Sequence, residues 1–260
     1  MNVKEGKINI SLIKDKVSRP YFPEREKIAL DLGLNELFAC NDGNLFGRNF
    51  KRKLLRYDLI LTKLMKNLQK QGIKPSKNKR YKNLTNDVRE YLKNEINRIL
   101  NRIIDLYKPR EIVLEKLNFQ NSNLSRKMNR VLNNFGKGII TKKLESIEEE
   151  FGIVITYINP AYTSQECSKC GYVDKNNRKS QKEFECKCCG NKKNADVNGS
   201  RAVFKRSSFK ELNVYRSKRY ILNFLLREFV ARVKRERCLY SRARFLVRWN
   251  DYFNEMKGFL

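Results

Sequence analysis

The chain has 260 residues and a formal net charge of +29, from 57 Lys and Arg against 28 Asp and Glu. A hydrophobic content of 40% predicts a globular protein, and the positive charge favours nucleic acid as partner over a membrane surface. Because histidine is absent, Ser-His triads, His-based acid–base catalysis and His metal ligands are excluded. No apolar run approaches the ~18 residues of a spanning helix, and the first residues lack a signal-peptide pattern, so we expect a cytoplasmic protein with reduced cysteines.

The first part of the chain predicts antiparallel strands followed by two long helices. After a strand candidate over 7–13 and two prolines, apolar runs predict strands over 28–32, 36–40 and 45–50. The turn Asn41-Asp42-Gly43 joins the last two strands. Leucines at helical spacing predict a helix that ends near Gly72, then a basic loop, then a helix over 84–107.

The second part alternates strands and helices. We expect a strand over 111–117, a helix from about 128 to 152, a strand over 153–158 and a helix over 195–205. A basic tail follows, with helices predicted over 220–238 and 239–256. Three antiparallel strands followed by strand–helix alternation predict an α/β protein of the RNase H-like class, with a mixed sheet and helices on both faces.

Four cysteines form the most specific motif in the chain. Cys167-x-x-Cys170 and Cys186-x-x-Cys189 are separated by fifteen residues, which is the spacing of a four-cysteine zinc site. Cys188 is an alternative to Cys189, and the CxxC spacing with the following Gly190 favours Cys189. We therefore predict one structural Zn²⁺ held by Cys167, Cys170, Cys186 and Cys189.

Three carboxylates stand at positions where a buried charge needs a partner. Asp31 ends an apolar strand, Glu115 interrupts the apolar run IVLEKL, and Asp196 opens a helix directly after the cysteines. Each has a structural alternative: Asp31 as a turn residue, Glu115 as a solvent-facing glutamate on an edge strand, and Asp196 as a helix N-cap. In the predicted fold the three would converge at one end of the sheet. Three acids without histidine suit two divalent cations, which can cleave a phosphodiester without a protein base.

These motifs resemble a known family. Three motifs carry the resemblance: DLGLN at 31–35, VLEKLNF at 113–119 and ADVNGSRAV at 195–203, the last preceded by residues 162–193, which we call the cysteine unit. They are similar to the three RuvC motifs and the zinc ribbon of TnpB-type (OrfB) transposon proteins, which are relatives of type V CRISPR effectors. The resemblance covers about residues 26–206. It implies an RNA-guided DNA endonuclease of bacterial or phage origin, with Asp31, Glu115 and Asp196 as catalytic acids that hold two Mg²⁺.

The resemblance also implies a domain plan. We expect a remnant of an N-terminal β region over 1–25, a RuvC core with a helical insertion over 26–161, a zinc ribbon over 162–193, the last core helix over 194–206 and a basic helical tail over 207–260. Because few residues precede Asp31, the N-terminal region that binds guide RNA in the family is expected to be reduced. Expected partners are DNA and a guide RNA, with no membrane and no small-molecule substrate.

Two other functions fit the same motifs. One is a non-cleaving nucleic-acid-binding remnant or repressor of the family, and the other is a transposase that joins DNA ends. Basic stretches at 51–53, 63–82 and 216–237 would contact phosphates in all three cases. Tyr81, Tyr172 and Phe184 lie among basic residues, and we interpret them as core residues rather than as base-stacking platforms.

Overall fold

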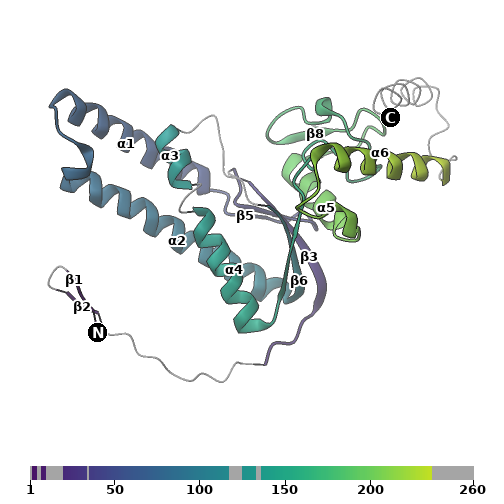
Figure 1. The fold of residues 1–260 in the computed structure, drawn as a ribbon, viewed down its shortest axis with the longest axis horizontal. Helices are drawn as coiled ribbons and strands as arrows, with labels where there is room; N and C mark the ends of the chain where they lie inside the picture. The colour runs from purple at the N-terminus through teal and green to yellow at the C-terminus, as the bar shows by residue number, and fades with distance from the viewer. Residues whose placement is uncertain are drawn as a thin grey trace.

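The computed structural model describes residues 2–4, 7–9, 20–33, 35–116, 125–132 and 136–235. Its centre is a five-stranded mixed sheet in the order β5-β4-β3-β6-β7 (Figure 1). The strands are β3 (Arg25–Leu32), β4 (Phe38–Cys40), β5 (Leu45–Phe46), β6 (Pro109–Glu115) and β7 (Val154–Ile158). The pairs β3–β4 and β4–β5 are antiparallel, whereas β3–β6 and β6–β7 are parallel. The predicted mixed α/β architecture is therefore confirmed.

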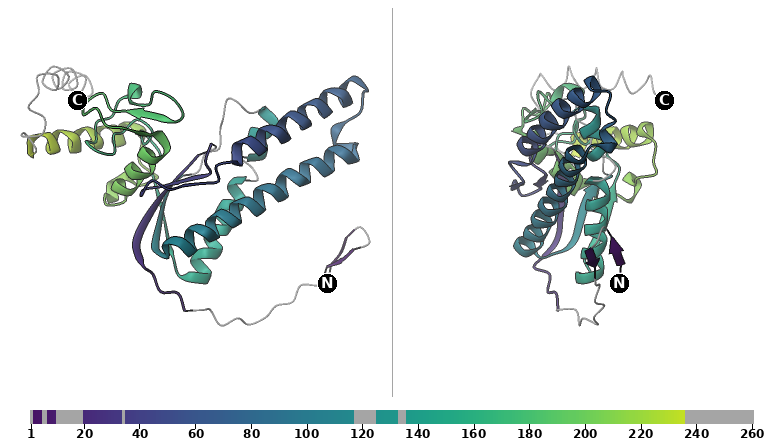
Figure 2. Two further views of the ribbon diagram at one scale, coloured as in Figure 1. Left: turned by 180° about the vertical axis from the view of Figure 1, so that it is seen from behind. Right: turned by 90° about the vertical axis from the view of Figure 1, so that its left-hand side faces the viewer.

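Helices cover both faces of this sheet. The larger core lies on one face, where Ile28, Leu30, Ile112 and Leu114 pack with α1 (Phe50–Lys70), α2 (Lys79–Tyr107) and α4 (Lys137–Phe151). The opposite face carries α5 (Ala195–Arg206), whose Val203 packs with Ala29 and Val113. Figure 2 shows α1 and α2 as a long antiparallel pair that extends away from the sheet.

Several predicted boundaries were wrong for identifiable reasons. The strand expected over 45–50 ends at Phe46, because Gly47 takes a positive φ of 80° and α1 begins at Phe50. The helix expected from 84 begins at Lys79, where the Asn78 side chain caps it by accepting from the Tyr81 amide at 3.0 Å. The strand expected over 111–117 is β6, which starts at Pro109 and ends at Glu115.

The remaining elements lie outside the central sheet. A short hairpin of β1 (Asn2–Lys4) and β2 (Lys7–Asn9) contains the start of the predicted 7–13 strand, and residues 10–13 lie outside the described part. The helix expected over 128–152 is α3 (Arg126–Val131) and α4. The cysteine unit contains η3 (Lys175–Asn177), β8 (Glu183–Glu185) and β9 (Lys192–Asn194). The short helix η1 (Pro75–Lys77) lies between α1 and α2, and η4 (Lys210–Leu212) and α6 (Lys218–Arg235) follow α5 in the chain.

Two smaller outcomes concern the tail and the aromatic residues. Helix α6 matches most of the helix expected over 220–238, and the helix expected over 239–256 lies outside the described residues. Tyr81, Tyr172 and Phe184 are buried, so the core interpretation of these rings is confirmed. None of the described helices is long and apolar enough to cross a membrane.

Candidate functional site

Strand alternation places Asp31 and Glu115 on the same face of the sheet. Side chains two residues apart in a strand point to the same side, so Asp31 follows Ala29 and Glu115 follows Val113 onto the face covered by α5. The parallel pairing of Leu30 with Leu114 makes Asp31 and Glu115 neighbours at the carboxyl ends of adjacent central strands. The two acids are half-buried. Their structural alternatives are wrong, because Asp31 pairs with Ala39 within β3 and β6 lies between β3 and β7.

Helix α5 brings Asp196 to the same place. Asn194, not Asp196, caps the helix: its side-chain oxygen accepts from the backbone amides of Asp196 at 3.0 Å and Val197 at 3.2 Å. The Asp196 side chain is therefore available for another role, and it is buried. The N-cap alternative for Asp196 is wrong, and the reason is a polar residue two positions earlier that competes for the same amides.

Two glycines allow α5 and β3 to approach closely. A Cβ atom at Gly199 of α5 would lie 2.5 Å from Oδ2 of Asp31, and one at Gly33 after β3 would lie 3.3 Å from Oδ2 of Asp196. Each carboxylate thus fills the space that a side chain on the opposite element would need. The three acids reach one site through this contact between a helix and a strand that are far apart in sequence.

Burial raises the pKa of all three acids. Burial raises the pKa of Asp31 well above its ordinary value, and the charges of Glu115 and Asp196 raise it further. Burial also raises the pKa of Glu115, against the opposing effect of a hydrogen bond with Thr163. The pKa of Asp196 is raised by burial as well, with the Arg178 guanidinium acting in the other direction. Burial is therefore the main reason that these acids favour their protonated forms.

Arg178 is a residue of this site that the sequence did not reveal. Its Nη2 lies 3.2 Å from Oδ1 of Asp196, and its charge lowers the pKa values of Asp31 and Glu115 as well. Its guanidinium also donates to the backbone carbonyls of Ser180 and Gln181, which orient it. In the sequence Arg178 stands among several lysines, and nothing distinguishes it from them. Only the folding of the cysteine unit over α5 brings this arginine to the acids.

A second arginine, Arg206, links α5 to the start of the cysteine unit. It is 1% exposed, and its Nε lies 2.7 Å from Oε2 of Glu166. Its Nη1 donates to the carbonyls of Asn159 at 3.1 Å and Ala161 at 2.7 Å. The charge of Arg206 also lowers the pKa of Glu115. This buried cation therefore fixes the joint between sheet, helix and cysteine unit, and it favours the ionised form of one of the acids.

The four predicted cysteines come together at one point. The sulfurs of Cys167, Cys170, Cys186 and Cys189 all lie within 4.8 Å of one another. The Cys167–Cys189 sulfur pair is 3.7 Å apart and the Cys170–Cys186 pair 3.6 Å apart. A tetrahedron with metal–sulfur bonds of about 2.3 Å has edges of about 3.8 Å, so the spacing suits a zinc ion. Cys188 is outside this group.

Both halves of the cluster have the same backbone. Gly171 follows the first CxxC with φ 83°, and Gly190 follows the second with φ 67°. In each half the amide of this glycine donates to the carbonyl of the first cysteine, at 2.8 and 2.9 Å. The positive φ is the reason that glycine stands there, and the two turns aim their sulfurs at one centre. The cysteine cluster can therefore hold zinc without rearrangement.

The cysteine cluster supports the acids through α5. Asn198 of this helix is fully buried; its side-chain oxygen accepts from the Ser168 amide at 3.0 Å and its nitrogen donates to the Glu166 carbonyl at 2.8 Å. Among the described residues the cysteines are the one group that brings metal-ligating atoms this close together. The three carboxylates are more widely spaced than that group.

The fold and the site define a class of protein: a mixed α/β domain with three converging carboxylates and an inserted four-cysteine unit. Residues 138–203, which span α4 to α5, match the family described as Cas12f1-like, TNB domain. The chain is 30% identical over 223 residues to InsQ of Escherichia coli K12, covering 76% of this chain and 53% of InsQ. It is 29% identical over 230 residues to a TnpB-like protein of Aquifex aeolicus, covering 78% of this chain and 74% of that protein.

Similarity to Cas12f1 is found in sequence and in fold. A 48-residue stretch is 56% identical to the CRISPR-associated endodeoxyribonuclease Cas12f1 of Syntrophomonas palmitatica, which is 18% of this chain and 10% of that protein. The structure of a Cas12f1-sgRNA-target DNA complex matches with a TM-score of 0.51 at 22% identity, over 73% of this chain and 51% of that chain. The expected resemblance to TnpB-type proteins is confirmed, and the chain spans about half the length of InsQ.

Proposed function

We propose that this chain is the nuclease part of an RNA-guided DNA endonuclease of the TnpB type, with an RNase H-like (RuvC) core. The observation that carries the proposal is the convergence of Asp31, Glu115 and Asp196 beside Arg178. The sheet order, with three antiparallel strands and then two parallel ones, supports the RuvC assignment. The names of the relatives, CRISPR-associated endodeoxyribonuclease and RNA-guided DNA endonuclease, support the reaction class and the two nucleic-acid partners.

The acids suit magnesium. Carboxylate oxygens are the ligands that Mg²⁺ prefers, and a bound cation would favour the ionised forms of three acids whose pKa values burial raises. Two bound Mg²⁺ ions would supply an activated water and would stabilise the leaving oxygen of a phosphodiester. Asp31 and Glu115 would hold the ions from the sheet, and Asp196 would hold them from α5.

The protein side of the mechanism is positioning and charge. Arg178 would donate to a non-bridging oxygen of the scissile phosphate, where negative charge develops, and the carbonyls of Ser180 and Gln181 keep its guanidinium in place. The cysteine unit holds Arg178 over α5 and thereby fixes the position of its guanidinium relative to the three acids. We propose a structural Zn²⁺ on Cys167, Cys170, Cys186 and Cys189. We keep the division at 1–25, 26–161, 162–193, 194–206 and 207–260 as the domain plan.

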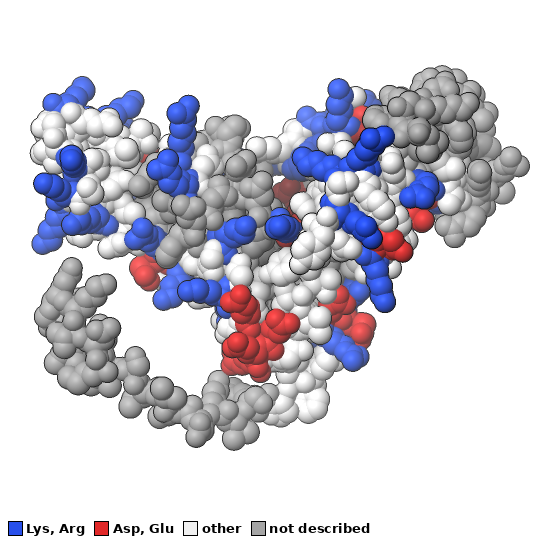
Figure 3. Space-filling view, viewed as in Figure 1, with Lys and Arg blue, Asp and Glu red and all other residues white. Residues whose placement is uncertain are grey.

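Charge on the surface suits the same partners. On the face in Figure 3, Lys and Arg gather over α1 and around α6, whereas acidic side chains gather where α4 (sequence KGIITKKLESIEEEF) lies. A strand of nucleic acid that approaches the three acids from either basic region would meet favourable potential.

A cleavage assay with a metal-binding readout tests the proposal. Labelled single-stranded DNA is incubated with Mg²⁺ and the wild type, Asp31→Asn or the control Asp105→Asn, which changes an exposed acid on α2. Mn²⁺ binding to each protein is titrated in parallel. We expect Asp31→Asn to lose both cleavage and Mn²⁺ affinity and the control to keep both. Equal cleavage by the three proteins would overturn the assignment of the acids.

A DNA-binding measurement and a transposon-end substrate, added to this assay, separate the other two functions. Tight, salt-sensitive DNA binding by the wild type, with no cleavage at any Mg²⁺ concentration, would support a non-cleaving binding protein. Joined products from a transposon-end substrate would support a transposase.

A further inference from the structure

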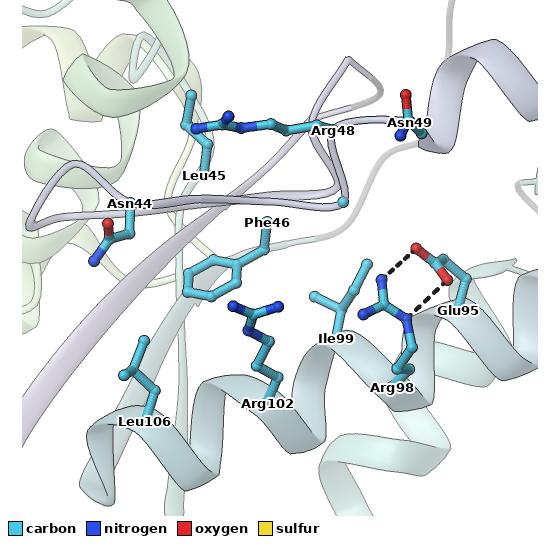
Figure 4. A pocket seen from close by; sticks show the side chains of 11 residues that line it. Asn44, Leu45, Phe46, Arg48, Asn49, Glu95, Arg98, Ile99, Arg102 and Leu106 are labelled. Atoms are coloured by element: carbon cyan, nitrogen blue, oxygen red, sulfur yellow. Dashed lines mark hydrogen bonds and ion pairs between the residues drawn. The ribbon is translucent and has the colours of Figure 1, made fainter.

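A cavity of about 400 Å³ lies away from the three acids, between the loop after β5 and helix α2 (Figure 4). Three arginines line it: Arg48 from the loop, and Arg98 and Arg102 from neighbouring turns of α2. The volume is within the range of small-ligand sites and suits a single nucleotide. None of these arginines was singled out by the sequence.

The wall of the cavity is fixed in place. Gly47, which precedes Arg48, has φ 80°, and a Cβ atom there would lie 2.8 Å from Cδ1 of Ile99 and 2.9 Å from Cβ of Leu37. The loop is thus pressed directly onto α2, and the Phe50 amide closes it by donating to the Gly47 carbonyl at 2.9 Å. The arginines are therefore presented by backbone that needs little reorganisation on binding.

The cavity has an excess of positive charge. Arg98 is paired with Glu95 at 2.7 and 3.1 Å, whereas in the described part of the chain neither Arg48 nor Arg102 has a carboxylate within ion-pair distance. Helix α1 begins at Phe50, next to the cavity. Its N-cap residue Asn49 makes no capping hydrogen bond with its side chain, and the first turn holds no acidic residue. The positive end of the α1 dipole therefore adds to the field of two unpaired guanidinium groups.

The floor of the cavity is apolar. Phe46 is nearly buried there, and Leu106, at the other end of the α2 face, is 54% exposed. A guanidinium group binds phosphate through two parallel hydrogen bonds, and an exposed leucine offers a surface for a base or a ribose. This combination favours a nucleotide over a simple anion.

We propose that this cavity binds one nucleotide of a nucleic-acid strand. Arg48 and Arg102 each take one of the two phosphates that flank this nucleotide, and Leu106 contacts its base or sugar. The choice of a nucleic-acid strand, rather than a free nucleotide, rests on the proposed function. DNA and RNA strands both offer phosphates, sugars and bases to this cavity, so the experiment measures the binding of one strand of each kind.

Contacts near the cavity lead towards the acids. Lys51, in the first turn of α1, donates to Asn35 at 3.0 Å and to Gln181 of the cysteine unit at 3.3 Å. The Gln181 carbonyl accepts from Arg178, which contacts Asp196. A strand held in the cavity could therefore follow basic side chains to the candidate catalytic site, so the cavity would act as a remote anchor for the bound strand.

Binding of short labelled single strands, one of DNA and one of RNA, tests the anchor. All proteins carry Asp31→Asn, so that a bound strand is not cut, and affinity is measured by fluorescence anisotropy over a range of KCl concentrations. Arg48→Ala/Arg102→Ala is compared with Lys93→Ala/Lys142→Ala, which removes equal charge from two exposed positions. Lys93 lies roughly opposite Arg102 on the α2 helical wheel, and Lys142 lies on α4. Arg48→Lys/Arg102→Lys keeps the charge and removes the guanidinium geometry.

We expect the arginine-to-alanine pair to weaken binding of at least one strand about tenfold, and to lower its salt slope by about 1.4, or about 0.7 for each lost phosphate contact. The lysine pair should recover part of the affinity, and the control pair should leave the salt slope of the parent. Thermal unfolding of each variant checks that the fold is kept. If the arginine pair and the control pair lose equal affinity for both the DNA and the RNA strand, the proposal that the cavity anchors a strand is wrong. Because no cleavage is measured, that result leaves the assignment of the acids untouched.

Discussion

Replacement of Arg206 by methionine should destabilise the protein strongly, because it leaves a buried carboxylate without its cation. Arg206 and Glu166 have side chains only 1% and 8% exposed, and their closest atoms are 2.7 Å apart. Two backbone carbonyls, those of Asn159 and Ala161, would lose their donor at the same time. Removal of one partner of a buried ion pair costs about 3–5 kcal/mol, and we expect a loss in that range.

An exposed ion pair provides the control. Arg98 and Glu95 are also 2.7 Å apart, yet their side chains are 56% and 21% exposed, so Arg98→Met should cost at most about 0.5 kcal/mol. The free energy of unfolding is measured for both variants by chemical denaturation with zinc present. The comparison holds the shortest contact distance constant. The two pairs differ in burial, and Arg206 also has two carbonyl acceptors.

A paired replacement tests the cause. Arg206→Met/Glu166→Leu removes both charges, so most of the loss should be recovered, because an apolar pair needs no counter-charge. The Nη2 atom of Arg206 is buried and has no hydrogen-bond partner among the described residues, which makes the native pair an imperfect one. If Arg206→Met costs no more than Arg98→Met, burial does not determine the value of this ion pair and the reasoning is refuted.

Three further predictions concern the metals and the acids. Desolvation and repulsion raise the pKa of Asp31 in the folded protein. At pH values above the ordinary pKa of Asp, the folded protein therefore binds more protons than the unfolded chain. The stability of the protein in Mg²⁺-free buffer should then fall as the pH rises through this range. Asp31→Asn should flatten this slope and raise stability at pH 8 relative to the wild type, and an unchanged slope in thermal unfolding would contradict this. Cys167→Ser should lower zinc content from about one ion per chain and expose the cysteine unit to proteolysis, and full retention of zinc would argue against the site. Arg178→Ala should slow cleavage about 10²–10³-fold with Mn²⁺ affinity retained, whereas parallel losses of both would make the arginine part of the metal site.

Local patterns in the sequence were enough to predict several parts of the site. The CxxC spacing predicted four neighbouring sulfurs, because each pair is confined to a tight turn whose geometry depends on adjacent residues. Apolar runs predicted the central strands, and a lone acid within each run marked Asp31 and Glu115. Periodicity predicted the long helices, whose ends were less accurate because a capping residue such as Asn78 reads as part of a polar loop.

Tertiary structure decided the rest. The sequence could not show that Asn194 rather than Asp196 caps α5, since both are good capping residues and the choice depends on where the helix meets the sheet. It gave no sign of Arg178, because a charge acquires its role from neighbours that are distant in the chain. The cavity with Arg48 and Arg102 likewise exists only because Gly47 allows a loop to press against α2. The sequence by itself determined which side chains could carry the chemistry, and long-range packing determined which of them meet.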